Sequence, residues 1–204
     1  MRRLTRFGLL ALSLATFAAL LGACGSTTDT STTTESPPAP KTYTNDQYGF
    51  SMTYDGRFEE GPTTGDASAA SRNVFLIAFP DKNGPMVNDT YADGLQVNVY
   101  ALPRKLKPAE VPLLRKQITK DAKSIMAALP GGKLEEPVEK ITINGVPGFS
   151  FGYSYVENDT PVRATVNFLF KGQYQYALTG QATADTWDAM EPQLETTLQS
   201  FTIQ

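Results

Sequence analysis

The sequence contains no histidine and a single cysteine, Cys24, among its 204 residues. Ser-His-Asp and Cys-His nucleophile systems are excluded, because both need an imidazole to carry the proton. Zinc sites built from cysteine and histidine are excluded as well. No disulfide can form within the chain, so the hydrophobic core alone must stabilise the fold. These absences favour a protein that is not an enzyme and that uses no cofactor.

Positive charge is also scarce beyond the N-terminus. The chain has 18 basic and 21 acidic residues, and three of the basic ones, Arg2, Arg3 and Arg6, precede Cys24. No acidic residue precedes Cys24, so the remainder has 15 basic against 21 acidic groups, a net charge of −6. A nucleic-acid partner would need a basic surface to displace counterions from phosphate. The charge balance therefore argues against nucleic-acid binding.

The first 23 residues have the organisation of a secretory signal peptide. Three arginines lie within the first six residues, and an apolar run extends over Phe7–Leu21. This run is shorter than the roughly twenty apolar residues that a transmembrane helix needs. It predicts export followed by cleavage.

The segment Leu21-Gly22-Ala23-Cys24 ends this signal and resembles the lipobox of bacterial lipoproteins. The resemblance implies that the sulfur of Cys24 takes a diacylglyceryl group and that the chain is cut before this cysteine. Two acyl chains, such as palmitate, anchor a protein stably, whereas one chain binds only marginally. We therefore expect a lipid-anchored protein on the extracytoplasmic side of the cell membrane or the outer membrane.

A polar spacer follows the cysteine. The stretch from Gly25 to Pro40 is rich in serine and threonine and ends in Pro37-Pro38-Ala39-Pro40, with almost nothing apolar to bury. Such a composition cannot offset the entropy lost on ordering, so we expect a disordered tether. The sequence thus divides into a signal peptide (1–23), a lipidated tether (24–42) and a single domain (43–204).

The domain alternates between the periods of strands and helices. Leu95, Val97 and Val99 alternate with polar residues, as in a half-buried strand that Pro103 and Pro108 then end. We expect strands over 48–54, 74–79, 95–101, 138–143, 148–155, 162–170 and 174–182. The turn signals Asn144-Gly145, Asn158-Asp159 and Lys171-Gly172 separate the last four strands into an antiparallel meander.

Two helices are expected. Val111, Ile118 and Ala122 belong to an apolar stripe over 111–129, which Pro130-Gly131-Gly132 ends. The second helix begins after the expected N-cap Thr183 and carries a stripe from Trp187 to Phe201, with a start or kink near Pro192. The order of elements predicts an α+β fold in which helices flank an antiparallel β-sheet.

From about Tyr43 onward the chain resembles the PsbP-like family. The opening Tyr48-Gly49-Phe50-Ser51-Met52 strand, the late meander and the closing Leu198-Gln199-Ser200-Phe201 carry the resemblance. It implies an α/β/α sandwich. The sequence departs from the pattern at Asp55-Gly56-Arg57-Phe58, where many relatives have a proline and a tryptophan. No binding residue is transferred.

Three surface features are candidate sites. A loop collects oxygen ligands that suit Ca²⁺, although its spacing is not that of an EF-hand and the turn-forming tendency of these residues favours a solvated loop. Its candidate ligands are Asp81, Asn83, Asn88, Asp89 and Asp93. A basic patch lies on and before the first helix, where lysines can attract an anionic membrane, although a solvated helix face is favoured. Its residues are Arg104, Lys105, Lys107, Arg115, Lys116, Lys120 and Lys123. The aromatic strand from Phe149 to Tyr155 can line an apolar pocket or, as we favour, pack under a helix.

The sequence therefore favours a membrane-anchored, non-catalytic binding or accessory module of the cell envelope, with an envelope protein or a glycan as partner. One alternative is a carrier or sensor of a small apolar or lipid ligand. A second is a carboxylate-dependent hydrolase, since paired carboxylates can act without histidine.

Overall fold

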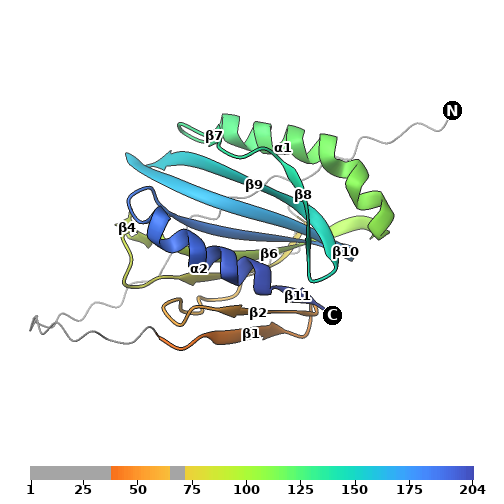
Figure 1. Cartoon of the computed structure of the whole chain (residues 1–204), viewed down its shortest axis with the longest axis horizontal. Coiled ribbons are helices and arrows are strands. Elements are labelled where there is room, and N and C mark those ends of the chain that lie inside the picture. Colours follow the sequence, from red (N-terminus) through yellow and green to blue (C-terminus); the bar gives the residue numbers. More distant parts are fainter. Residues whose placement is uncertain (1–37, 65–71) are drawn as a thin grey trace, which may run out of the picture.

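The computed structural model describes residues 38–64 and 72–204 and shows one large antiparallel sheet (Figure 1). Its strands follow the order β3-β6-β10-β9-β7, and β8 also pairs with β9. The bounds are β3 Asn73–Pro80, β6 Gly94–Leu106, β7 Lys133–Leu134, β8 Glu139–Ile143, β9 Val146–Glu157 and β10 Thr160–Thr183. The turns Asn144-Gly145 and Asn158-Asp159 connect β8 to β9 and β9 to β10, with positive φ at all four residues. Both predicted hairpins are confirmed.

Smaller strand groups complete the β-structure. A three-stranded sheet has the order β1-β2-β11, and β4 pairs with β5 in a separate hairpin. The bounds are β1 Lys41–Asn45, β2 Phe50–Tyr54, β4 Met86–Val87, β5 Thr90–Tyr91 and β11 Thr202–Ile203. The sequence did not predict β1 or β11, and β1 begins two residues before the expected domain boundary at 43.

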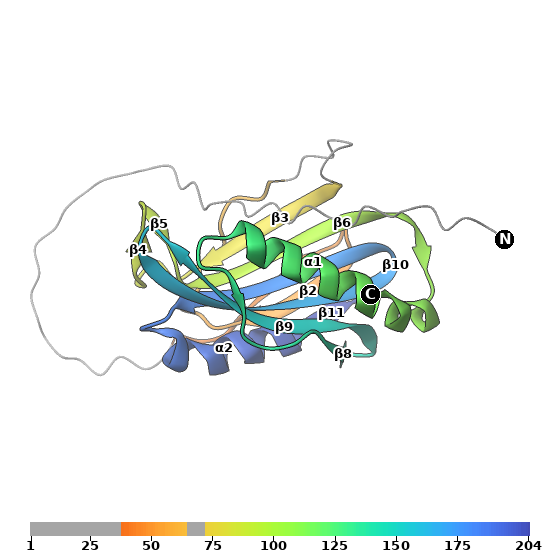
Figure 2. The ribbon, with the colours of Figure 1, turned by 90° about the horizontal axis from the view of Figure 1, so that it is seen from above.

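Two α-helices cover opposite faces of the large sheet. Helix α1 (Arg115–Ala128), preceded by the 3₁₀-helix η1 (Pro108–Leu114), lies across one face, as Figure 2 shows from above. Helix α2 (Trp187–Ser200) and the three-stranded sheet lie on the other face (Figure 1). The predicted α+β sandwich is therefore confirmed.

Each face of the large sheet has its own hydrophobic core. On the α1 side, Ile118, Ala122 and Met126 pack on the aromatic side chains of β9. On the α2 side, Leu194 and Leu198 are packed in a cluster that also contains residues of β2, β3, β6 and β10. The sheet is buried from both sides over most of its length.

The predicted end of the third strand at Pro103 is wrong, because β6 continues to Leu106. The pairing of β6 with β10 changes register here, from Tyr174 opposite Ala101 to Gly172 opposite Leu106. A proline is tolerated in such an irregularity, where its missing N–H is not needed for the ladder.

The turn expected at Lys171-Gly172 lies inside β10. Residues 160–169 of β10 pair with β9 and residues 172–181 pair with β6, and Gly172 has a φ of 61°. Even-numbered residues face α1 in the first half, whereas Ala177 does so in the second. The chain therefore does not turn at the expected position. One continuous strand there changes its pairing partner from β9 to β6, and its odd-numbered rather than even-numbered residues come to face α1.

The predicted helix starts also need correction. The first segment is a 3₁₀-helix up to Leu114, because Pro112 lacks the N–H of a regular α-helical turn. Helix α2 has Thr186, not Thr183, as its N-cap, and it continues through Pro192 without starting there. The hydroxyl of Thr183 instead lies 2.9 Å from that of Thr186.

Candidate functional site

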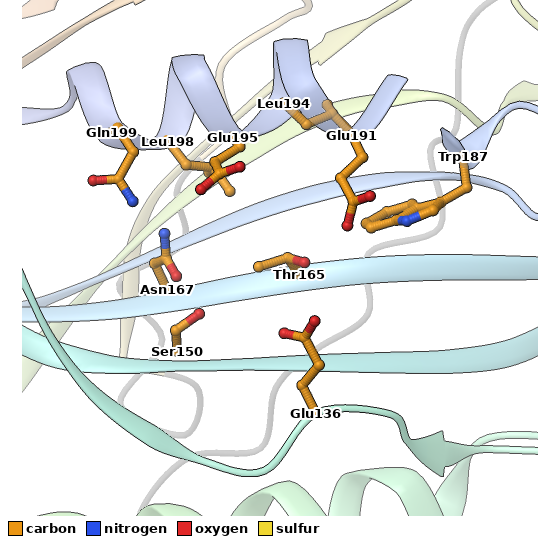
Figure 3. A pocket seen from close by; sticks show the side chains of 10 residues that line it. All are labelled: Glu136, Ser150, Thr165, Asn167, Trp187, Glu191, Leu194, Glu195, Leu198 and Gln199. Atoms are coloured by element: carbon orange, nitrogen blue, oxygen red, sulfur yellow. The ribbon is translucent and has the colours of Figure 1, made fainter. Parts of the chain in front are cut away.

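A polar pocket of about 190 Å³ lies between α2 and the sheet (Figure 3). Strands β9 and β10 form its floor, α2 forms its roof, and one residue comes from the loop before β8. Its lining residues are Glu136, Ser150, Thr165, Asn167, Trp187, Glu191, Leu194, Glu195, Leu198 and Gln199. Sequence reasoning did not assign a role to this set.

The floor is polar because of the alternation along β9 and β10. Successive residues of a strand point to opposite faces, so Phe149 and Phe151 face α1 while Ser150 between them faces α2. On β10, Thr165 and Asn167 alternate in the same way with residues of the α1-side core. Asn167 is paired with Ser150 in the sheet register. Their polar side chains therefore lie side by side beneath α2.

The roof is one edge of α2. Glu191, Glu195 and Gln199 recur every four residues and share a face of the helix, with exposed side chains. Leu194 and Leu198 are buried and hold the helix on the sheet. Gly180 permits this close packing, because a Cβ there would lie 3.1 Å from the Cβ of Leu194. The helix thus places carboxylates over the polar floor.

Glu136 completes the pocket from the opposite side. Its backbone N–H donates to the carbonyl of Gly152 at 3.1 Å. A Cβ on Gly152 would lie 3.1 Å from Cγ and Cδ of Glu136, so the missing side chain leaves room for the glutamate to lie over the strand. Figure 3 shows the carboxylates of Glu136 and Glu191 pointing toward one another across the pocket.

Two polar side chains of the pocket are deeply buried. Trp187 is 3% exposed, and its Nε1–H has no hydrogen-bond partner among the described residues. Figure 3 shows its indole extending from the start of α2 into the pocket beside Glu191. Asn167 is also 3% exposed, and its amide makes no hydrogen bond within the part of the chain that the structure describes. Buried polar groups are normally paired, so the amide of Asn167 indicates room for a ligand or for water, whereas the Nε1–H of Trp187 has too little accessible surface to meet either.

The guanidinium group of Arg163 lies over the indole ring of Trp187. Its guanidinium carbon lies 5.2 Å from the ring centroid, and its Nη1 lies 3.6 Å from the carboxylate of Asp188. This cation–π contact covers one face of the indole ring.

The carboxylates of the pocket differ from others on the surface. Glu59, Glu110 and Glu135 are paired with lysine or arginine, and these ion pairs lower the pKa of each carboxyl. Within the described ranges, Glu136, Glu191 and Glu195 have no such cationic partner. The pocket therefore concentrates uncompensated negative charge.

Both ends of α2 are fixed. At its start, the carboxylate of Asp93 accepts the backbone N–H of Thr183 at 2.8 Å. At its end, the hydroxyl of Ser200 accepts the N–H of Thr53 at 2.9 Å. The amide of Asn144 donates to the carbonyls of Gln199 and Phe201. The roof of the pocket is consequently anchored to three separate segments.

The candidate calcium ligands do not converge. Asp81 and Asp93 lie near each other, and the backbone N–H of Asp81 donates to the carbonyl of Asp93 at 2.9 Å. Asn83 follows Asp81 in a turn, while Asn88 and Asp89 form the exposed tip of the β4–β5 hairpin with positive φ. Over residues 38–64 and 72–204, no three acidic, cysteine or histidine side chains are grouped to hold a metal.

Asp93 instead has a structural environment. Its side chain is 2% exposed, and burial raises the pKa of its carboxyl despite the opposing hydrogen bonds from Thr186 and Thr183. The nearby charge of Asp81 raises this pKa further. In the sequence, Asp93 stands directly before the strand that became β6. An aspartate at that position is as typical of a turn as of a metal ligand.

The structure divides the predicted basic patch. Arg104 forms a two-pronged ion pair with Glu110 at 3.1 and 3.0 Å, and Arg115 donates to the carbonyl of Val138. Arg104 is therefore neutralised by a carboxylate, whereas the neutral carbonyl of Val138 leaves the positive charge of Arg115 uncompensated. The exposed lysines Lys105, Lys107, Lys116, Lys120 and Lys123 remain on the α1 side.

The aromatic strand packs under α1, as the sequence favoured. Phe149, Phe151, Tyr153 and Tyr155 are all buried in the core that includes Ile118. Burial raises the pKa of both tyrosines.

The lipobox residues Leu21, Gly22, Ala23 and Cys24 lie outside the described residues. Within the described ranges, no helix is long and apolar enough to cross a membrane.

No family model and no curated protein matches the sequence. Solved structures do match, among them cyanobacterial PsbP (CyanoP) from Synechocystis sp., with a TM-score of 0.54 and 15% identity over 90% of this chain and 99% of that one. The fold is PsbP-like. A protein from Bacteroides thetaiotaomicron has a TM-score of 0.50 and 11% identity over 80% of this chain and 48% of that one.

A third structure, LpqN of Mycobacterium tuberculosis, is described as involved in cell envelope biogenesis. Its TM-score is 0.49, at 14% identity over 83% of this chain and 86% of that one. At 15% identity the likeness to CyanoP shows the fold alone, so function has to be argued from the pocket.

One signal in the sequence could have located the pocket. A sheet that is covered on both faces usually has nearly continuous apolar strands. Here Ser150, Gly152 and Ser154 alternate with the aromatic residues of β9, and Arg163, Thr165 and Asn167 alternate with apolar residues of β10. A polar face on two neighbouring strands is the pattern expected where a helix covers the sheet incompletely.

Proposed function

We propose that this chain is a lipoprotein of the bacterial cell envelope, anchored through lipid on Cys24, whose PsbP-like domain binds a partner without catalysis at the pocket beneath α2. The observation that carries the proposal is the polar floor of this pocket, where the buried side chain of Asn167 makes no hydrogen bond among the described residues and lies beside Ser150. A binding site supplies partners for such groups only when it is occupied.

The anchor is supported by the sequence of the signal. The lone cysteine follows a leucine, a glycine and an alanine at the end of an apolar run. Replacing it in Cys24→Ser removes the sulfur that accepts the lipid. We expect the variant to leave the membrane fraction after a carbonate wash, while the wild-type protein stays there. A variant that remained in the membrane would refute anchoring through Cys24.

The binding role is tested by crosslinking in cells. A photoreactive amino acid at Gln199, on the rim of the pocket, should capture a partner that mass spectrometry can identify. Leu113, which is 80% exposed on the α1 side, provides the control position. Equal capture of the same molecules from both positions would contradict a specific role for the pocket.

A carboxylate-dependent hydrolase is the second candidate, because Glu136 and Glu191 face each other across the pocket. Both glutamates are exposed, whereas a general-acid carboxyl usually lies in apolar surroundings. We therefore favour binding over catalysis. Hydrolysis of an envelope glycan by the wild-type protein, lost in both Glu136→Gln and Glu191→Gln, would establish the enzyme instead.

The lipid-carrier alternative gains less support. The aromatic side chains expected to line an apolar cavity are packed against α1. Mass spectrometry of the purified protein tests this alternative, and a stoichiometric co-purifying lipid would favour a carrier.

A further inference from the structure

The outer side of α1 carries a row of lysines that no described element covers. Ile118 and Ala122 face the sheet and are buried. Lys116, Lys120 and Lys123 recur at spacings of four and three residues on the opposite side of the helix and are exposed. Figure 1 shows α1 as the outermost layer on its side of the sheet, and Figure 2 shows it from above. We call these three residues the lysine row, which is open to a partner from outside the chain.

Positive charge is concentrated around the lysine row. Residues 101–132 contain seven basic and two acidic residues, a net charge of +5. This leaves 8 of the 15 basic and 19 of the 21 acidic residues for the rest of the chain after Cys24, a net charge of −11. Of the two acidic residues, Glu110 already forms an ion pair, and the half-buried Asp121 accepts a hydrogen bond from a glutamine. Within the described ranges, the lysine row has no ion-pair partner, so its charge is uncompensated.

An exposed leucine lies beside the lysine row. Leu113 is 80% exposed and lines the same shallow hollow as Lys116 and Lys120. Transfer of a leucine side chain out of water is favourable. At a membrane surface, such a side chain enters the boundary of the acyl chains, while neighbouring lysines keep their charged ends among the head groups. The outer side of α1 thus combines the two kinds of side chain that an interfacial contact uses.

The composition of this face favours a lipid surface over a protein. Protein interfaces are enriched in aromatic residues and arginine and are depleted in lysine. Residues 103–129 contain no aromatic residue. A lysine ammonium is a strongly hydrated point charge without the two-pronged geometry that arginine offers to a carboxylate. Anionic lipids present a layer of negative charge that demands no such geometry, so they complement this face.

The length of the tether allows α1 to lie on the bilayer. Strand β1, which follows the tether, lies on the other face of the large sheet (Figure 1). The 14 residues from Cys24 to Pro38, the first described residue, span at most about 50 Å at 3.3–3.6 Å each. The three layers of the domain measure about 30 Å together, because packed layers lie about 10 Å apart. The chain is therefore long enough to pass around the domain.

We propose that the outer side of α1 docks the domain on an anionic lipid surface, with the lysine row at the phosphate groups and Leu113 in the interface beneath them. The position of the domain beside a bilayer rests on the proposed anchor at Cys24, whereas the contact itself belongs to α1. The exposed Lys105 and Lys107 extend the same positive surface. Because α1 and α2 lie on opposite faces of the sheet, docking turns the pocket beneath α2 away from the lipid and toward a partner.

The first experiment removes the lipid, so that only the protein surface can bind. The mature chain with Cys24→Ser is sedimented with vesicles of phosphatidylcholine alone and with vesicles that also contain phosphatidylglycerol. We expect binding only to the vesicles with phosphatidylglycerol at about 0.1 M salt, and loss of this binding at about 1 M salt, where the Debye length falls from about 10 to about 3 Å. Equal binding to both vesicles, or binding to neither, would overturn the proposal.

Matched pairs of lysines locate the contact. One lysine near an anionic surface strengthens binding about fivefold, so Lys116→Gln with Lys120→Gln should weaken it about 25-fold. The control pair, Lys41→Gln with Lys171→Gln, removes the same charge beside the three-stranded sheet, where Lys171 donates to the carbonyl of Ile203. It should change vesicle binding by less than about twofold. Thermal unfolding verifies that each variant is folded, and equal losses in the two pairs would overturn the proposal.

The apolar part of the contact is tested separately. Leu113→Ser should weaken vesicle binding by at least about fourfold, the contribution of one buried methylene. Met86→Ser, at a 53% exposed position on the β4–β5 hairpin, is the control and should bind as before. Soluble polyphosphate distinguishes a bilayer from a dissolved polyanion. If polyphosphate binds more tightly than the vesicles and Leu113→Ser weakens neither, the lipid surface is overturned in favour of a soluble polyanion.

These outcomes are separable from those of the proposed function. Carbonate removes proteins that are held by charge alone, so the carbonate wash tests the anchor whether or not α1 docks. If Cys24→Ser binds no vesicles while the wild-type protein stays in the washed membrane fraction, docking is overturned and the anchor stands. Vesicle binding that depends on the lysine row, with no partner captured from Gln199, would support docking and count against the binding role of the pocket.

Discussion

The two faces of the large sheet are covered by helices of equal length that meet very different surfaces. Helices α1 and α2 each contain 14 residues. Under α1, the alternate residues of β9 and β10 are aromatic or aliphatic and fill the space. Under the outer edge of α2, the intervening residues of the same strands are polar and leave a pocket. One pair of strands thus supplies a packed core on one face and a binding surface on the other.

The largest test of this contrast compares neighbouring residues of the two faces. Phe151→Ala removes a side chain that is 1% exposed, so we expect the free energy of unfolding to fall by about 3–5 kcal/mol. Thr165→Ala, in the pocket floor, should lower it by less than about 1 kcal/mol. Urea unfolding measures both. Similar losses would mean that the two faces are packed alike.

Trp187 provides a second test of how the α2 face of the sheet is packed. Trp187→Phe loses part of a buried ring and also removes a donor that has no partner in the described structure. Because an unsatisfied donor is unfavourable, the two effects partly cancel, and we expect a loss of about 1 kcal/mol. Met190→Ala in the same helix, also buried, serves as the control and should lose about 2–5 kcal/mol. A greater loss in Trp187→Phe would show that its N–H is bonded in solution.

The pH dependence tests the attachment of α2. Burial raises the pKa of Asp93 above its ordinary value of 3.8, so the folded state binds this proton more tightly than the unfolded state. Its contribution to stability is therefore full below pH 3.8 and is lost as pH rises through the folded pKa. Asp93→Asn stays neutral and lacks this change.

Unfolding of the wild-type protein and Asp93→Asn over the acidic range gives the measurement. As pH falls, the unfolding free energy of the wild-type protein should rise relative to that of Asp93→Asn. Parallel pH profiles would show that the carboxyl of Asp93 is not perturbed in the folded protein.

The smallest expected effect concerns the roof. Glu191 and Glu195 are like charges one turn apart, which destabilises a helix by about 0.2–0.5 kcal/mol. Glu191→Gln should raise stability by this amount at low salt and by less at high salt. A stability loss would indicate that Glu191 has a favourable partner, contrary to the pocket described above.

Features encoded by neighbouring residues were the ones that the sequence predicted correctly. Asn144-Gly145 and Asn158-Asp159 favour positive φ by themselves, and both form the predicted turns. Strand β11 was missed because its two residues gain strand structure only from β2, where Thr202 is opposite Ser51. Its pairing depends on the whole intervening domain, and no local pattern reveals it.

The pocket was missed for a similar reason. Glu136, Ser150 and Glu191 belong to three elements that are far apart in sequence, and only the packing of α2 on the sheet brings them together. The candidate loop and the basic patch were visible because their residues are close in sequence. Proximity along the chain proved a poor guide to the site, since Arg104 is paired with Glu110 and the acidic loop does not converge.

The fixed ends of α2 have a consequence for the speed of binding. Asp93 holds the segment before the helix, and Thr53 and Asn144 hold its last residues, so the roof cannot swing open as a lid. A ligand must enter from the open side of a preformed site. Docking of this kind needs no slow rearrangement, and association rate constants of about 10⁵–10⁷ M⁻¹s⁻¹ are typical. Residence time, and hence selection among partners, is then determined by the contacts inside the pocket.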